Sequence, residues 1–587
     1  MKSSTFQLSS ACAGALALAG LLACTGLAAG CMGTGVSANA KLDRSTDRST
    51  DRSTDRSTDP ATLKGRLYEG FDGYAREVTT GSPEAQRWFD QGIQLLYGYN
   101  HDEAIRSFER AAEADPTCAM AWWGAAYARG LHINNPQVSD DASRAAHEAA
   151  RRAVAELDDE SPVEQALIKA TAVRFAEALP EDRRPHEEAY AAAMEKVWHA
   201  FPDDADVGAL YAESLMNLQP WDLWTGDGQP KGRVLEILGV LERTLEKHPN
   251  HPGANHFFIH SIEASPWPEA GTKSAEQLVN LVPGSGHLVH MPSHIFMRTG
   301  RYAEAADANT RAIASDEAYF AKAPAPDFYS LYFMHNVHFL AYAAMMEGRY
   351  ETAMDAATKI QRLIPQNFLT DYVTIADGFM PTSLHVQIRF GKWNDILEAP
   401  EPPAERLVSR AIRHFARAIA LANLGRIGQA REELGAFDEV AADVTDDWFV
   451  GNNPAGEVLA TARTMAQGEV AYFAGDKGKA FDLLREAVER EENLTYDEPP
   501  GWMQPVRHAL GALLLKEGHA ADAERVYRED LERHPENAWS LLGLKQSLEA
   551  QDKTAEASAM ADRVKAAWSR ADAEAPASCY CAVEGEG

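Results

Sequence analysis

A pattern of small residues and prolines at fixed offsets constrains the fold of this chain more than any other feature. Counted from Ala85 as position 1, Gly92 is position 8, Ala104 position 20, Phe108 position 24 and Pro116 position 32. A glycine and an alanine at these offsets let two antiparallel helices approach closely, and the proline ends the second helix. The frame recurs toward the C-terminus at Gly468, Ala480 and Ala487, at Gly511, Ala523, Tyr527 and Pro535, and at Trp539, Gly543 and Ala555. The pattern therefore predicts repeated helix pairs.

These are the positions by which a tetratricopeptide repeat is recognised, and the resemblance covers residues 82–568, with insertions between repeats. It implies an all-α helical solenoid of antiparallel helix pairs. With 587 residues the chain is too long for one small core, which also favours a repeat array. We expect these parts: a lipoprotein signal peptide 1–30, a disordered tether 31–63, an N-terminal repeat segment 64–200, a histidine-rich central repeat segment 201–366, a C-terminal repeat segment 367–570 and a flexible tail 571–587.

The first forty residues have the pattern of an export signal. Lys2 precedes an apolar run over residues 11–29, and Cys31 and Cys24 each follow small residues, as the acylated cysteine of a bacterial lipoprotein does. Cys31 is preferred, because cleavage there leaves a hydrophobic core of normal length. An ordinary secretory signal cut after Ala40 is the alternative. We therefore expect an exported protein, lipid-anchored at a membrane and facing the periplasm or the cell exterior.

A tetrapeptide Asp-Arg-Ser-Thr follows four times, beginning at Asp43, Asp47, Asp51 and Asp55. It has no apolar residue and balanced charge, so it cannot bury a face and is predicted to be a disordered tether. The other cysteines leave three alternatives open: Cys118 paired with a tail cysteine, Cys579 and Cys581 as a hook for a soft metal, or a frayed tail without function.

The charge and the motifs exclude several function classes. A net charge of −31 argues against nucleic-acid binding, which depends on Lys and Arg, and suits metal cations or cationic partners better. The sequence has no P-loop, no glycine triplet of the Rossmann type and no nucleophile elbow. An enzymatic function must therefore come from another feature.

That feature is a cluster of histidines: residues 248–338 hold nine of the nineteen. Seven histidines and one glutamate take positions 2, 5, 9 and 12 of three consecutive repeats, which begin at Pro252, Gly286 and Met334. They are His256, His260 and Glu263; His287, His290 and His294; and His335 and His338. Residues spaced by three and four lie on one helix face, and the repeat resemblance implies that this face lines a concave groove. The preceding repeat places Glu213 at position 9, beside them.

Convergent imidazoles are typical of a transition-metal site. Neutral imidazole suits copper, zinc and iron, and three or four imidazoles with one carboxylate form a normal ligand set. Seven histidines exceed one mononuclear site, so either two or more metals bind, or some histidines support the ligands or transfer protons. Glu213 and Glu263 are the candidates for a carboxylate ligand or a catalytic base. Pro292 predicts a helix start, with His287 and His290 in a lead-in turn.

The chain also resembles a family of exported bacterial tetratricopeptide proteins. The segments that carry this resemblance are 88–92, 118–124, 256–265, 286–294 and 335–339. The resemblance supports the architecture and the integrity of the histidine cluster, and it brings no activity with it. Two hypotheses follow. In the first, a membrane-tethered scaffold binds a protein or peptide in its groove and holds metal there, as repeat arrays are usually interaction platforms. In the alternative, the histidines form a metalloenzyme centre, oxidative with copper or iron or hydrolytic with zinc.

Overall fold

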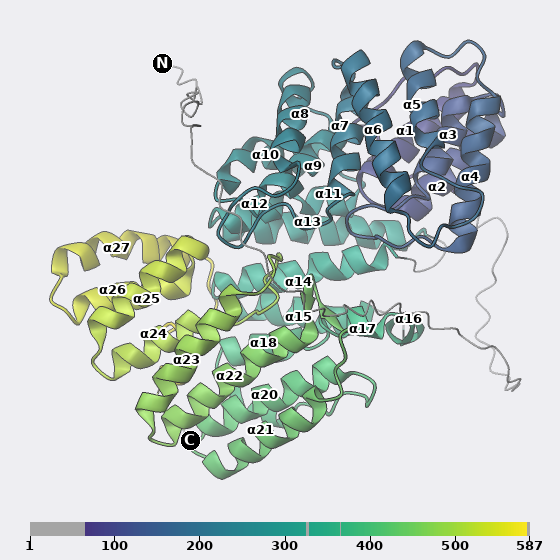
Figure 1. Ribbon diagram of the computed structural model, residues 1–587. Helices are drawn as coiled ribbons and strands as arrows, with labels where there is room; N and C mark the ends of the chain where they lie inside the picture. Colours follow the sequence, from purple (N-terminus) through teal and green to yellow (C-terminus); the bar gives the residue numbers. More distant parts are fainter. Residues whose placement is uncertain (1–64, 324–327, 364–365, 584–587) are drawn as a thin grey trace, which may run out of the picture. The chain divides into compact units, whose positions relative to one another are not determined.

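The computed structural model describes residues 65–323, 328–363 and 366–583 (Figure 1). All of them belong to one unit of the chain, residues 58–587. The predicted signal peptide, the lipidation candidates Cys31 and Cys24, and the Asp-Arg-Ser-Thr tether lie outside the described residues. None of the described helices is long and apolar enough to cross a membrane.

The described chain is helical almost throughout. Its first part contains α1 (Pro83–Tyr97), α2 (His101–Ala114), α3 (Ala119–Tyr127), α4 (Asp140–Ala155), α5 (Pro162–Ala172), α6 (Arg184–Ala200), α7 (Ala205–Met216) and α8 (Val234–Lys247). The central part contains α9 (Pro252–Ile262), the 3₁₀ helix η1 (Pro268–Gly271), α10 (Thr272–Leu281), α11 (Gly286–His290), α12 (Pro292–Arg298), α13 (Tyr302–Phe320), α14 (Ser330–Met346) and α15 (Tyr350–Leu363).

The last part contains α16 (Gln366–Asp371), α17 (Val373–Ala376), α18 (Thr382–Arg389), α19 (Trp393–Glu398), α20 (Leu407–Asn423), α21 (Ile427–Ala441), α22 (Ala455–Phe473), α23 (Lys477–Glu492), α24 (Val506–Lys516), α25 (Ala520–Arg533), α26 (Ala538–Glu549), α27 (Thr554–Ala567) and η2 (Tyr580–Ala582). Two short strands, β1 (Phe449–Val450) and β2 (Asn453–Pro454), pair antiparallel, with Phe449 opposite Pro454.

Consecutive helices pack as antiparallel pairs, which confirms the all-α prediction (Figure 1). The frame read from the sequence explains the close packing. A Cβ on Gly92 would meet the Phe108 ring at 2.8 Å, and one on Gly511 would meet the Tyr527 ring at 2.5 Å. In both repeats the glycine at position 8 of the first helix therefore makes room for the aromatic ring at position 24 of the second.

Three helices around the histidine cluster, α7, α9 and α11, begin at side-chain caps. Asp204 accepts from the backbone of Val207 at the start of α7, and Ser285 caps α11. The Nδ1 of His251 accepts from the Ala254 N–H at 3.0 Å at the start of α9, where Pro252 has no N–H to lose. Its Nε2 then donates to Asp206 at 3.0 Å. These caps fix the rotational setting of each first helix.

Within the predicted flexible tail, the described residues include buried side chains. Ser578 is buried, its Oγ donates to the carbonyl of His508 at 2.9 Å and lies 2.5 Å from the Tyr527 hydroxyl. Cys579 and Cys581 form a disulfide with each other, and Cys118 is free and buried. Ser578 is held by buried polar contacts with α24 and α25, which composition alone does not reveal.

Candidate metal centre

The predicted histidines converge from four helices. His256 and His260 lie on α9, His287 and His290 on α11, His294 on α12, and His335 and His338 on α14. All are buried except His335, which is half-buried. Pro292 begins α12, as the sequence predicts, but His287 and His290 lie in the short helix α11 rather than in a lead-in turn. Met291, the residue between α11 and α12, keeps a helical backbone, so His287, His290 and His294 stay on one face.

The first group consists of His256, His260 and His287, whose ligand atoms all lie within 4.8 Å of one another. We call it triad 1. The Nε2 atoms of His256 and His287 are 3.2 Å apart. The Nε2 of His260 is buried and has no hydrogen-bond partner among the described residues. A metal bound by imidazoles at about 2.0–2.1 Å fits such a spacing.

The second group, triad 2, consists of His290, His294 and His335 and meets the same 4.8 Å limit. The Nε2 of His290 lies 2.9 Å from the Nε2 of His294 and 3.1 Å from that of His335. The two triads are adjacent. The ring centroids of His260 and His294 are 5.6 Å apart, and those of His287 and His290 are 5.8 Å apart.

Outer contacts set the tautomers of three imidazoles, and a fourth imidazole lies close to a carboxylate. The Nδ1 of His256 donates to the Tyr97 carbonyl at 2.7 Å, and the Nδ1 of His290 donates to the Asn309 amide oxygen at 2.7 Å. The Nδ1 of His260 donates to Glu263 at 2.7 Å, and that of His294 lies 2.6 Å from the same carboxylate. With the proton on Nδ1, the Nε2 atoms of His256, His260 and His290 each present a bare lone pair toward their triad.

Glu263 stands between the two triads. Its Oε1 faces His260 of triad 1 and its Oε2 faces His294 of triad 2, and the Tyr496 hydroxyl donates to Oε2 at 3.1 Å. Burial raises the pKa of this carboxyl, but His294 and His260 outweigh that effect and hold the pKa below its usual range. Glu263 is therefore an anion that orients one imidazole in each triad.

Five of the six triad imidazoles are held in the neutral form. Burial, reinforced by the neighbouring histidines, holds the pKa of His256, His287, His290 and His335 well below the usual value. Burial also lowers the pKa of His260. Neutral imidazole is the form that binds a metal ion.

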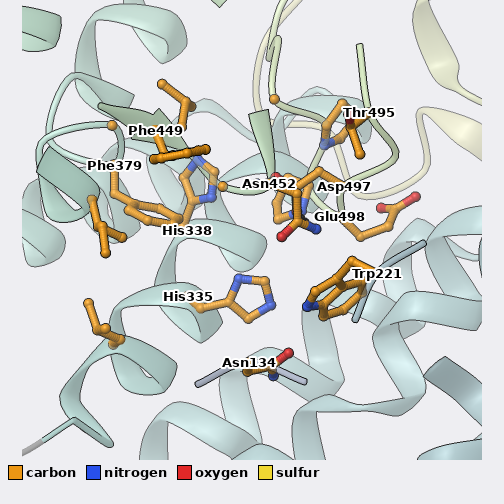
Figure 2. Close-up of a pocket in the computed structure, with 18 of the residues that line it drawn as sticks. Asn134, Trp221, His335, His338, Phe379, Phe449, Asn452, Thr495, Asp497 and Glu498 are labelled. Atoms are coloured by element: carbon orange, nitrogen blue, oxygen red, sulfur yellow. Dashed lines mark hydrogen bonds between the residues drawn. The ribbon is translucent and has the colours of Figure 1, made fainter. Parts of the chain in front are cut away.

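A cavity of about 540 Å³ opens onto both triads. Four triad residues line it, namely His260 and His287 of triad 1 and His294 and His335 of triad 2. Its other walls are mostly apolar, and Figure 2 shows Trp221, Phe379 and Phe449 around it. Asn134, Asn452, Asp497 and Glu498 add polar groups. Burial raises the pKa of Asp497 to about 7, partly offset by backbone N–H donors.

Two of the residues predicted for the site lie outside the triads. Glu213, on α7, accepts a hydrogen bond from Tyr127 at 2.7 Å, and none of the imidazole contacts described above involves it. Burial raises its pKa to about 7, although Tyr127 and Arg174 oppose the shift. His338 shares α14 with His335, but its Nε2 lies 3.2 Å from the sulfur of Met503.

Sequence reasoning missed the residues that support the triads. Asn309 is one of them, and a signal was present: it occupies position 24 of the repeat that begins at Gly286, where other repeats have Phe108 and Tyr527. A polar residue at an aromatic core position marks a specific partner, here His290. Tyr99 packs edge-on against His256, with ring centroids 4.6 Å apart, from a turn with φ 54°. No repeat position indicated it.

Comparisons with known proteins do not assign a family. No family model matches the chain. A segment of 167 residues is 34% identical to cellulose synthase operon protein C of Xanthomonas axonopodis pv. citri (strain 306), which covers 28% of this chain and 10% of that protein. This chain therefore spans about a tenth of the relative's length.

Solved structures with a similar course of helices are distant. A human IFIT1 dimer with m7Gppp-AAAA is 13% identical, with a TM-score of 0.31 over 86% of this chain and 98% of the other. The Cut9 and Hcn1 hetero-tetramer of APC/C is 14% identical, with a TM-score of 0.30 over 82% and 76%. Likenesses at this level carry no argument about function.

Proposed function

We propose that this protein holds two transition-metal ions, one in each histidine triad, and acts as a metal-dependent enzyme on a small, largely apolar molecule bound in the adjoining cavity. The helical repeats serve as the scaffold that brings α9, α11, α12 and α14 together. A bound metal would supply redox or Lewis-acid chemistry.

One observation carries the proposal. The Nδ1 of His290 donates to Asn309, and the Nδ1 of His294 lies 2.6 Å from Glu263, yet the Nε2 atoms of the two histidines lie 2.9 Å apart. If both protons are on Nδ1, two bare lone pairs repel each other at this distance in a buried place, and a cation between them removes the repulsion. His335 adds a third nitrogen at 3.1 Å from His290. The outer acceptors are those that metal-binding histidines have in proteins.

The cavity supports an enzymatic role over a purely structural one. A catalytic metal site keeps a coordination position open, whereas a structural site is closed by protein ligands. Each triad supplies three imidazoles and exposes two of them to the cavity. The volume of about 540 Å³ is in the range of pockets for small molecules, and the mixture of apolar walls with a few polar groups is typical of them.

A protein or peptide partner in the same cavity, with the metal in a structural role, is the second candidate. It is favoured by the repeat architecture, since such arrays commonly bind other proteins. Either proposal includes export and a lipid anchor on Cys31 or Cys24. Both are supported by the sequence pattern of the first forty residues.

The first test is metal analysis of the mature protein, purified from an exported fraction without a histidine tag. We expect about two ions per chain, one from each triad. Copper or iron would direct substrate screening to oxidations, and zinc to hydrolysis. His256→Ala should remove the ion of triad 1, His290→Ala that of triad 2, and the double variant both. His199→Ala, at an exposed position, is the matched control.

Circular dichroism of each variant checks that helical content is retained. Two ions in the correctly folded double variant would refute the assignment. A wild-type protein that takes up no copper, iron or zinc on reconstitution would refute it as well and leave the peptide-binding scaffold.

A further inference from the structure

A third group of donors lines the cavity beyond the two triads. It consists of His338 on α14, His385 on α18, and Met503 in the segment before α24. The Nε2 of His338 lies 3.2 Å from the Met503 sulfur. Figure 2 shows His338 and His335 around the same cavity, both from α14.

The segment that carries Met503 is fastened to His385 on both sides of the sulfur. The ring of Trp502 packs edge-on against the His385 ring, with centroids 5.4 Å apart. The side-chain amide of Gln504 donates to the His385 carbonyl at 2.6 Å. These contacts hold the residues on both sides of Met503 against α18, and the thioether itself contacts the imidazole of His338.

The two imidazoles of this group have unused nitrogen atoms. The Nδ1 of His338 and the Nδ1 of His385 are both buried and have no hydrogen-bond partner among the described residues. His338 and His385 are each 6% exposed. A buried imidazole nitrogen without a partner costs free energy comparable to a lost hydrogen bond. The Nδ1 of His338 lies on the side of its ring away from the Met503 sulfur, so an ion beside that sulfur would use the Nε2 of His338 and could take up the Nδ1 of His385.

We propose that His338, His385 and Met503 form a third metal site, specific for the soft monovalent cation Cu(I). Thioether sulfur is a poor ligand for hard cations such as Mg²⁺ and a good one for Cu(I), and imidazole serves Cu(I) as well. Two neutral nitrogens and one neutral sulfur also add no negative charge, which suits a monovalent ion better than a divalent one in a buried place.

The inference deepens the proposed function, because it identifies copper as the metal that this cavity handles. The third site can be distinguished from the two triads by experiment, since the triads contain no sulfur ligand and share no residue with it. A third site on the same wall would place Cu(I) next to the cavity without occupying either triad.

The experiment uses the full chain under anaerobic conditions, with Cu(I) as the probe in competition with a chromogenic Cu(I) chelator. Compared with wild type, Met503→Leu should bind one Cu(I) per chain less, or bind it at least about tenfold more weakly. His385→Gln should have the same effect. Met465→Leu, also a buried methionine but on α22, is the matched control and should behave as wild type.

X-ray absorption of the copper-loaded protein gives a second readout. Wild type should show a sulfur neighbour at about 2.3 Å from copper, and Met503→Leu should not. The zinc count should be the same in both proteins. An unchanged Cu(I) count in both Met503→Leu and His385→Gln, or no sulfur neighbour in wild type, would overturn the third site.

The triad variants separate the two proposals. If the His256→Ala and His290→Ala double variant keeps one Cu(I) with a sulfur neighbour, the third site is supported independently. If wild type has this sulfur-bound ion but none that depends on His256 or His290, the third site holds and the dinuclear proposal fails.

Discussion

At the scale of single residues, Glu263 has the largest influence on the candidate centre. It is fully buried, and its two oxygens contact an imidazole of each triad. A buried carboxylate stays ionised only when charged or polar groups contact it. Here His260, His294 and Tyr496 make these contacts. In the proposed centre its role would thus be to orient two ligands.

Replacing Glu263 by glutamine tests this role. Glutamine has one acceptor oxygen, and its NH₂ would face an imidazole N–H, so one of the two histidines must change tautomer or turn away. We expect the affinity for at least one metal ion to fall by about 10–100-fold, with helical content retained. The measurement is competition against a metal chelator.

Glu246→Gln makes the same chemical change at an exposed position of α8 and serves as the control. Equal affinities of wild type and Glu263→Gln at both sites would show that the carboxylate does not support the ligands.

The sequence predicted the six histidines that form the triads, because positions 2, 5 and 9 repeat at a fixed interval, but the same pattern included His338, which contacts Met503 instead. It could not predict their division into two triads. That division depends on tertiary contacts such as Asn309 with His290 and Tyr97 with His256, and the second of these uses a backbone carbonyl that no side-chain pattern encodes.

At the scale of helices, the repeat frame explains the packing more fully than helix propensity does. Gly511 lies inside α24, where an alanine would favour the helix by about 1 kcal/mol, yet the Tyr527 ring occupies the space of its Cβ. The same ring also fills the space of a Cβ on Gly543 of α26. Tyr527 thus joins three helices through two glycines.

We expect Gly511→Ala to lower the free energy of unfolding by about 1–3 kcal/mol, because the buried tyrosine must shift. Gly239→Ala is the matched control: it also lies inside a helix, α8, but has nothing within 4 Å of its new Cβ, and should raise stability by up to about 1 kcal/mol. Denaturant unfolding followed by circular dichroism compares them. Equal effects of the two substitutions would mean that propensity alone controls this position.

The frame was sufficient to predict these helix pairs, since glycine at position 8 and alanine at position 20 require close approach. It was insufficient for α11 and α12, where the histidine spacing and Pro292 give conflicting indications. The structure reconciles them with two short helices around Met291 that keep the face continuous.

At the scale of the whole molecule, the cavity unites parts of the chain that are far apart in sequence. Trp221, His335 and Glu498 come from three separate segments, and their proximity follows from the path of all the helices between them. No local pattern predicts such a set, so the sequence indicated the ligands and not the substrate pocket.

Metal removal should therefore affect global stability. The triads join α9, α11, α12 and α14, so ions bound only by the folded chain stabilise it by about 4 kcal/mol per site at a thousandfold excess over the dissociation constant. We expect the unfolding temperature to rise when the metal-free protein is reloaded. The His256→Ala and His290→Ala double variant should show no rise, whereas His199→Ala should rise as wild type does; the same rise in all three would contradict the assignment.

The shared carboxylate has a consequence for the order of loading. A cation bound by His260 makes the Nδ1–H group of this residue a stronger donor to Oε1 of Glu263. The carboxylate then carries less negative charge for its contact with His294. The two sites are then thermodynamically linked, and linkage is reciprocal: whichever ion binds first changes the affinity for the other by the same factor. Repulsion between the ions adds to this effect in a buried place. Occupancy should thus proceed in two separated steps, and a half-loaded protein should be a distinct species with its own affinity and reactivity.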